Sequence, residues 1–260
     1  MKAMIFAAGL GTRLRPFTLS HPKALVPVGG KPMLRRVIEK LRDSGISRMV
    51  INTHHFAGQI AGYLRDNDNF GCDISISFED ELLETGGGLL KARTLLDDGS
   101  GEPILVHNAD ILTDFPIEEM EECFRIDEAD ITLLVDRRDT SRYFIFDTVG
   151  NQLCGHINLT TGACSSPHVL TCGVPPTPET LADACYSLLA FGGVHILSIK
   201  ALDALAVYAS TLDRPEGPFS IVDFYKQNSA LRITPYTPSA PYRWHDIGKL
   251  STLAEAENTL

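Results

Sequence analysis

The sequence lacks any long hydrophobic run. None of its apolar stretches approaches the roughly 18 residues that a membrane helix needs. Near the N-terminus only Met4–Ala8 is continuously apolar, and Gly9 and Arg13 follow it, so the stretch is shorter than the apolar region of a signal peptide. We therefore expect neither a membrane span nor a secretory leader, and we expect a cytoplasmic protein.

Paired cysteine motifs are missing as well. Six cysteines occur and none forms a C-x-x-C pair. Four of them share the segment 154–185 with His156 and His168, at successive spacings of 10, 8 and 13 that fit no zinc-finger pattern. These four are Cys154, Cys164, Cys172 and Cys185. We expect reduced thiols there rather than a zinc site.

Positive charge is scarce outside the first 50 residues. The chain carries 23 Lys and Arg against 33 Asp and Glu, a net charge of −10. The first 50 residues hold ten of these cations and only two acids, so they stand at +8 and the remainder at −18. A general nucleic-acid surface is not expected, because a phosphate backbone needs a wide basic surface. The local surplus indicates one anionic partner near the N-terminal part of the chain.

Short apolar strands alternate with segments that place apolar residues at helical spacing. Strands are predicted at 2–7, 48–52, 73–78, 103–107 and 131–135. The helices between them are predicted from residue 32 to Gly45 and at 57–65, 88–96 and 116–124. This alternation predicts an α/β fold, a Rossmann-like three-layer sandwich with a mostly parallel sheet.

The pattern changes after Tyr143. Paired strands are predicted at 144–147 and 152–158, and the Gly-, Pro-, Ser- and Thr-rich stretch that follows suggests a small β-rich insertion at about 155–185. Further elements are predicted as strands at 188–196, 231–236 and 242–247 and as helices from Ser198 and at 220–228 and 251–258. No internal repeat and no long linker divides the chain, so we expect a single domain over residues 1–260.

A glycine-rich loop at 9–11 follows the first predicted strand. A dinucleotide fingerprint would need a glycine where Leu14 stands, and a P-loop would need Ser or Thr where Pro32 stands. The small residues nevertheless let backbone N–H groups approach a phosphate. Three nearby cations supply charge: Arg13, Arg15 and Lys23. A tight turn with solvated cations is the alternative interpretation, and the cations at 35, 36, 40 and 42 are expected to form the solvated face of a helix.

Several longer motifs then occur in a fixed order. Residues 5–18 are IFAAGLGTRLRPFT, followed by PKALVPV at 22–28 and Lys31-Pro32. Later motifs are ETGGG at 84–88, NAD at 108–110, FGGV at 191–194 and WHDIG at 244–248. Together they resemble the signature of the sugar-1-phosphate nucleotidylyltransferases, and within that family the chain most resembles N-acetylmuramate-1-phosphate uridylyltransferases and mannose-1-phosphate guanylyltransferase-like proteins.

The resemblance implies an enzyme that transfers a nucleoside monophosphate from a nucleoside triphosphate to a sugar 1-phosphate and releases pyrophosphate. We expect UTP and N-acetylmuramate 1-phosphate as substrates, with GTP and mannose 1-phosphate, or a related hexose or heptose phosphate, as the alternative. Residues 1–136 would form the nucleotide-binding half and 137–260 the sugar-phosphate-binding half. Neither nucleic acid nor membrane is an expected partner, and a monomer and a homodimer are both compatible with the sequence.

The resemblance also implies a role for each site residue. Arg13 would bind the outer phosphates and Lys23 the α-phosphate, where charge shifts in the transition state. The backbone cradle of the triphosphate would be formed by Ala8, Gly9, Gly11 and Thr12. The remaining nucleotide or sugar contacts would be Gly86 and Gly87 for the base, Asn108 for the nucleotide or a sugar hydroxyl, Gly193 for the sugar, and Asp136 for a sugar hydroxyl. For Asp136 a strand-end turn is an equally good interpretation.

Two aspartates are the expected magnesium ligands. Asp110 and Asp246 each end an apolar segment, so both can lie at the carboxyl edge of the sheet, where ligands bind in such folds. Mg²⁺ prefers one or two carboxylates together with phosphate oxygens and water. Asp114 stands before Pro116 and is expected to cap a helix instead.

The cation for the sugar phosphate is not evident from the sequence. Residues 155–184 contain neither Lys nor Arg, so Arg142 or Lys249 is expected to substitute. Two other functions remain open. One is a choline-phosphate cytidylyltransferase, since that segment is acidic and free of cations. The other is a catalytically silent nucleotide-sugar sensor subunit, although Arg13, Lys23 and both aspartates are present.

Overall fold

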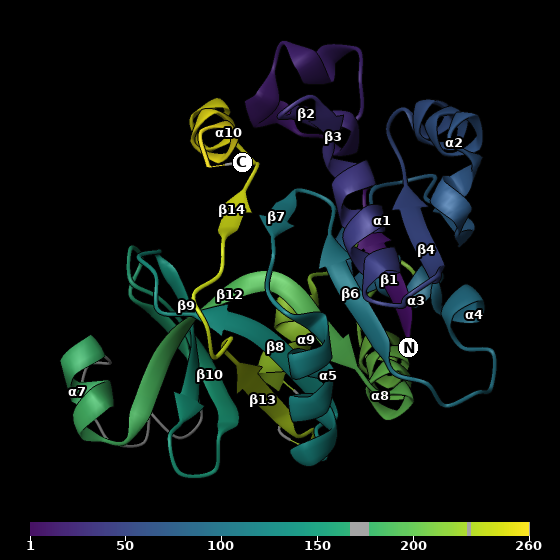
Figure 1. Cartoon of the computed structure of the whole chain (residues 1–260). Helices are drawn as coiled ribbons and strands as arrows, with labels where there is room; N and C mark the ends of the chain where they lie inside the picture. The colour runs from purple at the N-terminus through teal and green to yellow at the C-terminus, as the bar shows by residue number, and fades with distance from the viewer. Residues whose placement is uncertain (167–176, 228–229, 260) are drawn as a thin grey trace.

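The computed structural model describes residues 1–166, 177–227 and 230–259 (Figure 1). A ten-stranded sheet forms its centre. The strands are β1 (Lys2–Phe6), β4 (Arg48–Thr53), β5 (Asp73–Phe78), β6 (Ile104–Asn108), β8 (Ile131–Asp136), β9 (Arg142–Asp147), β10 (Gln152–Asn158), β11 (Ala163–Ser165), β12 (Tyr186–Leu197) and β13 (Ile233–Tyr236). Their order is β11-β10-β9-β12-β6-β1-β4-β5, with β8 paired to both β12 and β13.

The directions of these strands divide the sheet into two parts. β1 runs parallel to β4 and β6, and β4 runs parallel to β5. The long strand β12 is antiparallel to β6, β8 and β9, and β9, β10 and β11 continue as an antiparallel extension. The predicted α/β class with a large, mostly parallel central sheet is confirmed. Because parallel neighbours end at the same edge, the loops after β1, β4 and β6 meet there.

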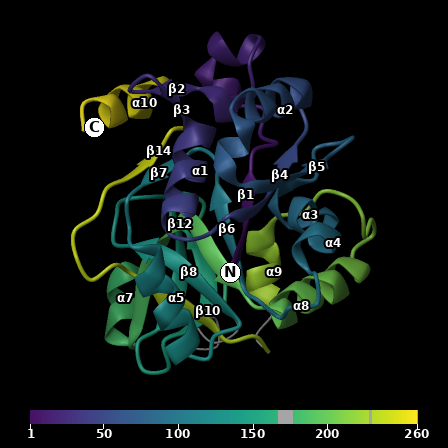
Figure 2. The same ribbon diagram turned by 45° about the vertical axis from the view of Figure 1, so that its right-hand side comes forward.

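Helices cover both faces of the sheet. They are α1 (Met33–Asp43), α2 (Ala57–Asp66), α3 (Glu84–Lys91), α4 (Arg93–Leu96), α5 (Ile117–Ile126), α7 (Pro178–Asp183), α8 (Ile199–Ser210), α9 (Ile221–Gln227) and α10 (Leu250–Glu257). α1 and α5 lie in front of the sheet in Figure 1, whereas α3, α4 and α8 gather on one side of the molecule in Figure 2. Within the described residues no helix is both long and apolar enough to cross a membrane.

The alternation of side chains along β1 explains the two cores. Ala3 and Ile5 point into a cluster with residues of α1, α2 and α5, while Met4 points into a second cluster with residues of α3, α8 and α9. All three side chains have no exposed surface. Burying a side chain the size of Met or Ile stabilises the fold by about 1.5–3 kcal/mol. A strand that is apolar on both faces is therefore most stable between two layers of helices.

A third, smaller core joins segments from the two ends of the sequence. The hairpin β2 (Pro27–Val28) and β3 (Lys31–Pro32) lies beside α10 at the top of Figure 1. The buried residues of this core are Leu14, Val26, Val28, Met33, Ile247 and Ala256. A second short pair, β7 (Ile111–Thr113) and β14 (Trp244–Asp246), runs antiparallel below it. The glycine-rich loop is therefore packed against the C-terminal segment.

Several element boundaries differ from the predictions. α3 begins at Glu84, four residues earlier than predicted, so the three glycines lie inside this helix rather than before it. Pro32 precedes α1 instead of forming its first turn. Asp114 does not cap α5; its two oxygens accept hydrogen bonds from the backbone N–H and the Nε–H of Arg243, at 2.6 and 2.7 Å. The predicted cap Ser198 does accept the N–H of Ala201, at 3.1 Å.

Candidate active site

The glycine-rich loop after β1 is folded tightly against Lys23. Gly11 has φ of +61°, and a Cβ at this position would lie 2.8 Å from Lys23 Cβ. The Thr18 hydroxyl donates to the Gly11 carbonyl at 2.8 Å and holds the same turn. A side chain at position 11 would therefore be strained and would displace Lys23, which explains the glycine without reference to a ligand.

A buried polar relay connects this loop to α3. The N–H of Ala7 donates to Asn52 Oδ1 at 2.7 Å, and Asn52 Nδ2 donates to Glu79 Oε1 at 2.6 Å. The other oxygen of Glu79 accepts the N–H of Leu83 at 3.0 Å. Glu79 is completely buried, so these bonds compensate for the loss of water around the carboxylate. This relay was not predicted, although the polar Asn52 near the end of β4 was a signal for it.

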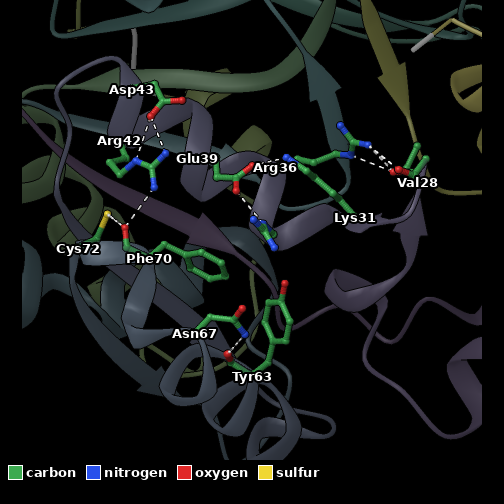
Figure 3. A network of polar contacts seen from close by, with 12 residues as sticks. Val28, Lys31, Arg36, Glu39, Arg42, Asp43, Tyr63, Asn67, Phe70 and Cys72 are labelled. Atoms are coloured by element: carbon green, nitrogen blue, oxygen red, sulfur yellow. Dashed lines mark hydrogen bonds and ion pairs between the residues drawn. The ribbon is translucent and has the colours of Figure 1, made fainter.

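Most cations of the first 50 residues already hold partners. Eight bond to carboxylates or backbone carbonyls: Lys2, Lys23, Lys31, Arg35, Arg36, Lys40, Arg42 and Arg48. Figure 3 shows part of this network, including Arg36 bonded to the Val28 carbonyl and Arg42 paired with Asp43. The predicted solvated face of α1 thus also serves structure. Among the described residues, Arg13 and Arg15 have no carboxylate partner and remain available for an anion.

A cavity of about 350 Å³ opens at the carboxyl edge of the parallel strands. Its lining combines the loop after β1, the end of β6 and the start of α3. The residues include Ala8, Gly9, Lys23, Leu82, Glu84, Thr85, Asn108 and Asp110. Five of these, Ala8, Gly9, Lys23, Asn108 and Asp110, were predicted site residues, and the structure brings them together. Thr12 is an exposed residue at the start of the short helix η1 (Thr12–Leu14), next to Arg13.

The two candidate metal ligands are brought together by the pairing of β7 with β14. Asp246 lies opposite Ile111 in this pair, and the N–H of Ile247 donates to the Asp110 carbonyl at 2.8 Å. Lys23 forms an ion pair with the carboxylate of Asp110. Residues separated by more than 130 positions in sequence therefore meet beside the cavity, which Asp110 lines. Two carboxylates and a lysine at one point are suited to binding a phosphate group and a cation together.

The carboxylate of Asp246 is partly buried. Burial raises its pKa, and the charge of Asp110 raises it further, while Lys23 and Arg13 act in the opposite direction. Its Oδ1 is buried and has no hydrogen-bond partner among the described residues. A buried carboxylate oxygen without a donor is costly, so this atom is suited to a cation ligand. Gly248 leaves room for this arrangement, because a Cβ there would lie 2.7 Å from Asp246 Oδ1 and 2.9 Å from Arg13 Nη2.

The set of acidic groups fits magnesium better than zinc. No cluster of three or more His, Cys, Asp or Glu side chains able to hold a metal occurs in the part of the chain that the structure describes. Cys172 and His168, from the segment considered for zinc, lie outside the described residues. Two carboxylates beside a phosphate site match the few protein ligands that Mg²⁺ takes.

A second, larger cavity of about 840 Å³ adjoins the first. Glu84 and Asn108 line both cavities, so the two are neighbours. Basic side chains of the larger cavity are Arg138, Arg142, His156 and Lys226. Burial lowers the pKa of His156 to about 4, helped by the charges of Lys226 and Arg142, so this imidazole is neutral at physiological pH. Sequence reasoning found Arg142 but missed Arg138, His156 and Lys226, which no motif marks.

Trp244 and Gly193 shape the boundary between the cavities. Trp244 Nε1 donates to the Gly192 carbonyl at 2.8 Å, and the guanidinium of Arg138 stacks 3.8 Å above the indole ring. Gly193 has φ of +75°, and a Cβ there would lie 2.9 Å from Asn108 Nδ2. Gly193 lines the larger cavity, where it was predicted to meet a sugar. The stacked Arg138 covers one face of Trp244. That face is therefore not available to a quaternary ammonium, such as the one that a choline-phosphate cytidylyltransferase would have to bind.

Three predicted contacts receive a structural explanation instead. The amides of Gly86 and Gly87 both donate to the Phe219 carbonyl, at 2.9 and 3.4 Å, so these donors are already engaged and do not face a base. A Cβ at any of the three glycines in α3 would lie 2.8 Å or less from a neighbouring atom, so close packing accounts for all three. Asp136 accepts hydrogen bonds from the N–H of Arg137 and from the hydroxyl of Tyr242. It lines neither cavity, which agrees with the alternative interpretation of Asp136 as a residue of a strand-end turn.

Comparison with known proteins identifies the family. A family model described as Nucleotidyl transferase matches residues 2–146. The chain belongs to the nucleotidyl transferase family. Mannose-1-phosphate guanylyltransferase 1 of Arabidopsis thaliana is 39% identical over 140 residues, which are 54% of this chain and 39% of that protein. Mannose-1-phosphate guanyltransferase beta-A of Xenopus laevis is 35% identical over 157 residues, 59% of this chain and 43% of that protein.

The match therefore spans less than half of the length of these curated relatives. A solved structure of UDP-glucose pyrophosphorylase complexed with UDP-glucose superposes with a TM-score of 0.74 and 20% sequence identity. It covers 99% of this chain and 97% of its own, so the whole chain shares the fold of that protein. The nucleotidyl transferase family match ends before β12 and β14, which supply Gly193 and Asp246.

Proposed function

We propose that the protein transfers a nucleoside monophosphate to a sugar 1-phosphate, with GTP and mannose 1-phosphate as the substrate pair. Similarity to mannose-1-phosphate guanylyltransferases favours this pair over the UTP and N-acetylmuramate 1-phosphate expected from the sequence. The observation that carries the proposal is the meeting of Arg13, Lys23, Asp110 and Asp246 where two cavities adjoin. Cations at this point would suit a triphosphate, and the adjoining cavity would suit a second substrate.

The reaction joins two polyanions, so neutralising charge and aligning the reacting groups are its main demands. An oxygen of the sugar phosphate attacks the α-phosphorus, a new P–O bond forms, and the bond from the α-phosphorus to the bridging oxygen breaks with loss of pyrophosphate. Lys23 lines the nucleotide cavity and would neutralise the α-phosphate. Arg13, exposed and without a carboxylate partner among the described residues, would hold the outer phosphates and the leaving pyrophosphate.

Asp110 and Asp246 would hold a Mg²⁺ ion. The unpartnered, buried Oδ1 of Asp246 and the proximity of Asp110 support this assignment. When bound, Mg²⁺ would offset the charge of the phosphate oxygens. Before substrate binds, the ion pair with Lys23 keeps the Asp110 carboxylate in place. Arg13 and Lys23 both stabilise the ionised form of Asp246, which a cation ligand requires.

Arg142 is the best candidate for the phosphate of the acceptor. It lines the larger cavity, and among the described residues its guanidinium has no carboxylate partner, whereas Lys226 pairs with Asp223 at 2.5 Å. Lys249, the other candidate from the sequence, stands just before α10 and lines neither cavity. The structure thus favours one of the two residues that sequence reasoning left open.

Pyrophosphate release by the purified protein tests the proposal. GTP, UTP and CTP would each be combined with mannose 1-phosphate, N-acetylmuramate 1-phosphate and phosphocholine, with Mg²⁺ present. We expect the highest kcat/KM for GTP with mannose 1-phosphate, and activity with another pair only would correct the substrates. Folded protein that is silent with every pair, but binds a nucleotide sugar in calorimetry, would be a sensor rather than an enzyme.

Substitution of one metal ligand provides a second test. Asp110→Asn should lower kcat by at least about 100-fold, because it removes charge from the cation site while keeping the side-chain shape. Asp203→Asn is the matched control, since Asp203 lies on α8 and pairs with Arg93 away from both cavities. Equal activity of the two variants would remove Asp110 from the site. Chelation by EDTA should abolish turnover, and added Mg²⁺ should restore it.

A further inference from the structure

Glu84 occupies the boundary between the two cavities. Its side chain lines both the smaller, nucleotide cavity and the larger, acceptor cavity, a position shared only with Asn108 among their lining residues. In the sequence Glu84 stands out only as the first residue of the ETGGG motif. An exposed carboxylate at this point faces both substrates of the proposed reaction.

The backbone of Glu84 adopts a conformation that disfavours glutamate. Its φ is +58°, in the left-handed region where a residue with a Cβ is strained. The surroundings impose this conformation from both sides. The preceding N–H, of Leu83, is held by Glu79, and the following side chain, of Thr85, accepts the N–H of Ile221 at 3.0 Å. Strained residues that the surroundings enforce are concentrated at functional sites, and glycine would relieve the strain here.

The charge environment of Glu84 restricts what it can bind. The other carboxylates that line the cavities lie near cations: Asp110 pairs with Lys23, Asp223 with Lys226, and Asp246 lies near Arg13. Glu84 has no ion pair or side-chain hydrogen bond among the described residues. An ionised carboxylate accepts hydrogen bonds and repels phosphate, so among the groups of a nucleotide and a sugar phosphate it can bind only the neutral donors. Two adjacent hydroxyls match the two oxygens of a carboxylate, as when an acidic residue binds a ribose.

We propose that Glu84 is a specificity-determining residue that accepts hydrogen bonds from sugar hydroxyls at the junction of the two cavities. The inference rests on the proposed transfer to a sugar phosphate and assigns one recognition group within it. The hydroxyls belong either to the ribose of the nucleotide or to the hexose of the acceptor. Both sugars carry the same chemistry, and kinetics distinguishes them.

The test is Glu84→Gly in the full-length protein. Removing hydrogen bonds to a charged group should lower kcat/KM by about tenfold to a hundredfold. A rise in KM for GTP, together with a loss of discrimination against 2′- or 3′-deoxy-GTP, assigns the ribose. A rise in KM for mannose 1-phosphate, together with a loss of discrimination against its deoxy analogues, assigns the hexose. Glu84→Gln should recover part of the activity because it retains one acceptor oxygen.

Glu128→Gly is the matched control. Glu128 is also an exposed glutamate with positive φ, +47°, but it follows α5 and lines neither cavity. Both variants relieve a strained backbone, so their melting temperatures should change alike, while only Glu84→Gly should alter the kinetics. Unchanged kinetics of Glu84→Gly, or changed constants with no effect on deoxy discrimination, would overturn the inference while the wild-type protein turns over. A silent wild type refutes the proposed function instead.

Discussion

The substitution Gly88→Ala tests the buried relay that joins the glycine-rich loop to α3. A Cβ at position 88 would lie 2.7 Å from Glu79 Oε1 and 2.9 Å from Asn52 Nδ2, in the middle of the relay. Overpacking costs about 1–3 kcal/mol, and weakening one hydrogen bond to a carboxylate costs about 1.5–3 kcal/mol. Alanine regains about 0.5–1 kcal/mol over glycine in a helix. We therefore expect a net loss of about 2–5 kcal/mol.

Gly62→Ala in α2 supplies the comparison for this measurement. A Cβ there would meet only Arg65 Nη2, at an ordinary distance of 3.7 Å, so the helix propensity should act alone and stabilise by about 0.5–1 kcal/mol. Unfolding in urea, followed by circular dichroism, would give the free energy of unfolding of each variant. The two substitutions should change it in opposite directions. If the free energy of unfolding of Gly88→Ala equalled that of Gly62→Ala, the hydrogen bond between Asn52 and Glu79 would not lie against Gly88 as described, and the reasoning would be refuted.

Three further outcomes follow from charges in the structure. Asp246→Asn should abolish turnover but raise the melting temperature in metal-free buffer at neutral pH. The rise is expected because burial raises the pKa of this aspartate, so that its ionised form destabilises the fold. A lower melting temperature would contradict this. Burial lowers the pKa of His107 to about 4 and that of His195 to about 3. Because the unfolded chain takes up protons on these histidines below about pH 6.5, the free energy of unfolding measured in urea should fall as the pH drops from about 6.5 toward 4. The fall should be less steep in His195→Leu, which lacks one of the two histidines. Arg142→Ala should raise KM for the sugar phosphate about tenfold or more and leave KM for GTP unchanged. Lys249→Ala should alter neither constant. If initial rates showed a higher KM for the sugar phosphate in Lys249→Ala and not in Arg142→Ala, the acceptor site would have to be placed at Lys249 instead.

The elements predicted best are those whose local pattern and tertiary setting agree. β5 spans the predicted residues 73–78, where apolar and polar residues alternate as in an edge strand. β1 and β4 differ from their predictions by one residue each, because both are largely apolar and buried on both faces of the sheet. α7 (Pro178–Asp183) was not predicted, since its stretch has little periodicity. The early start of α3 was also missed, because Gly86–Gly88 favour a loop locally. These glycines are explained only by tertiary contacts, with residues 217–219 for Gly86 and Gly87 and with the relay for Gly88.

The candidate site shows the same division. Arg13, Lys23, Asp110 and Asp246 were found because each stands in a motif, and the structure brings them together. Arg138 was missed because its importance comes from the stacking on Trp244, more than 100 residues away in the sequence. A site residue can be predicted from the sequence when it stands in a motif. It cannot be predicted when its role depends on a strand that is distant in sequence and packs beside it only in the folded chain.

The pairing of β14 with β7 also sets the time at which a newly made chain can complete the proposed site. Asp246 is synthesised 136 residues after Asp110, and translation at about 5–20 residues per second separates them by roughly 7–27 s. During that interval the growing chain already contains Arg13 and Lys23, but β7 has no partner and the second carboxylate does not exist. A nascent chain therefore holds the two cations of the proposed site well before it holds the second carboxylate, and the site is complete only after β14 has been made and paired with β7.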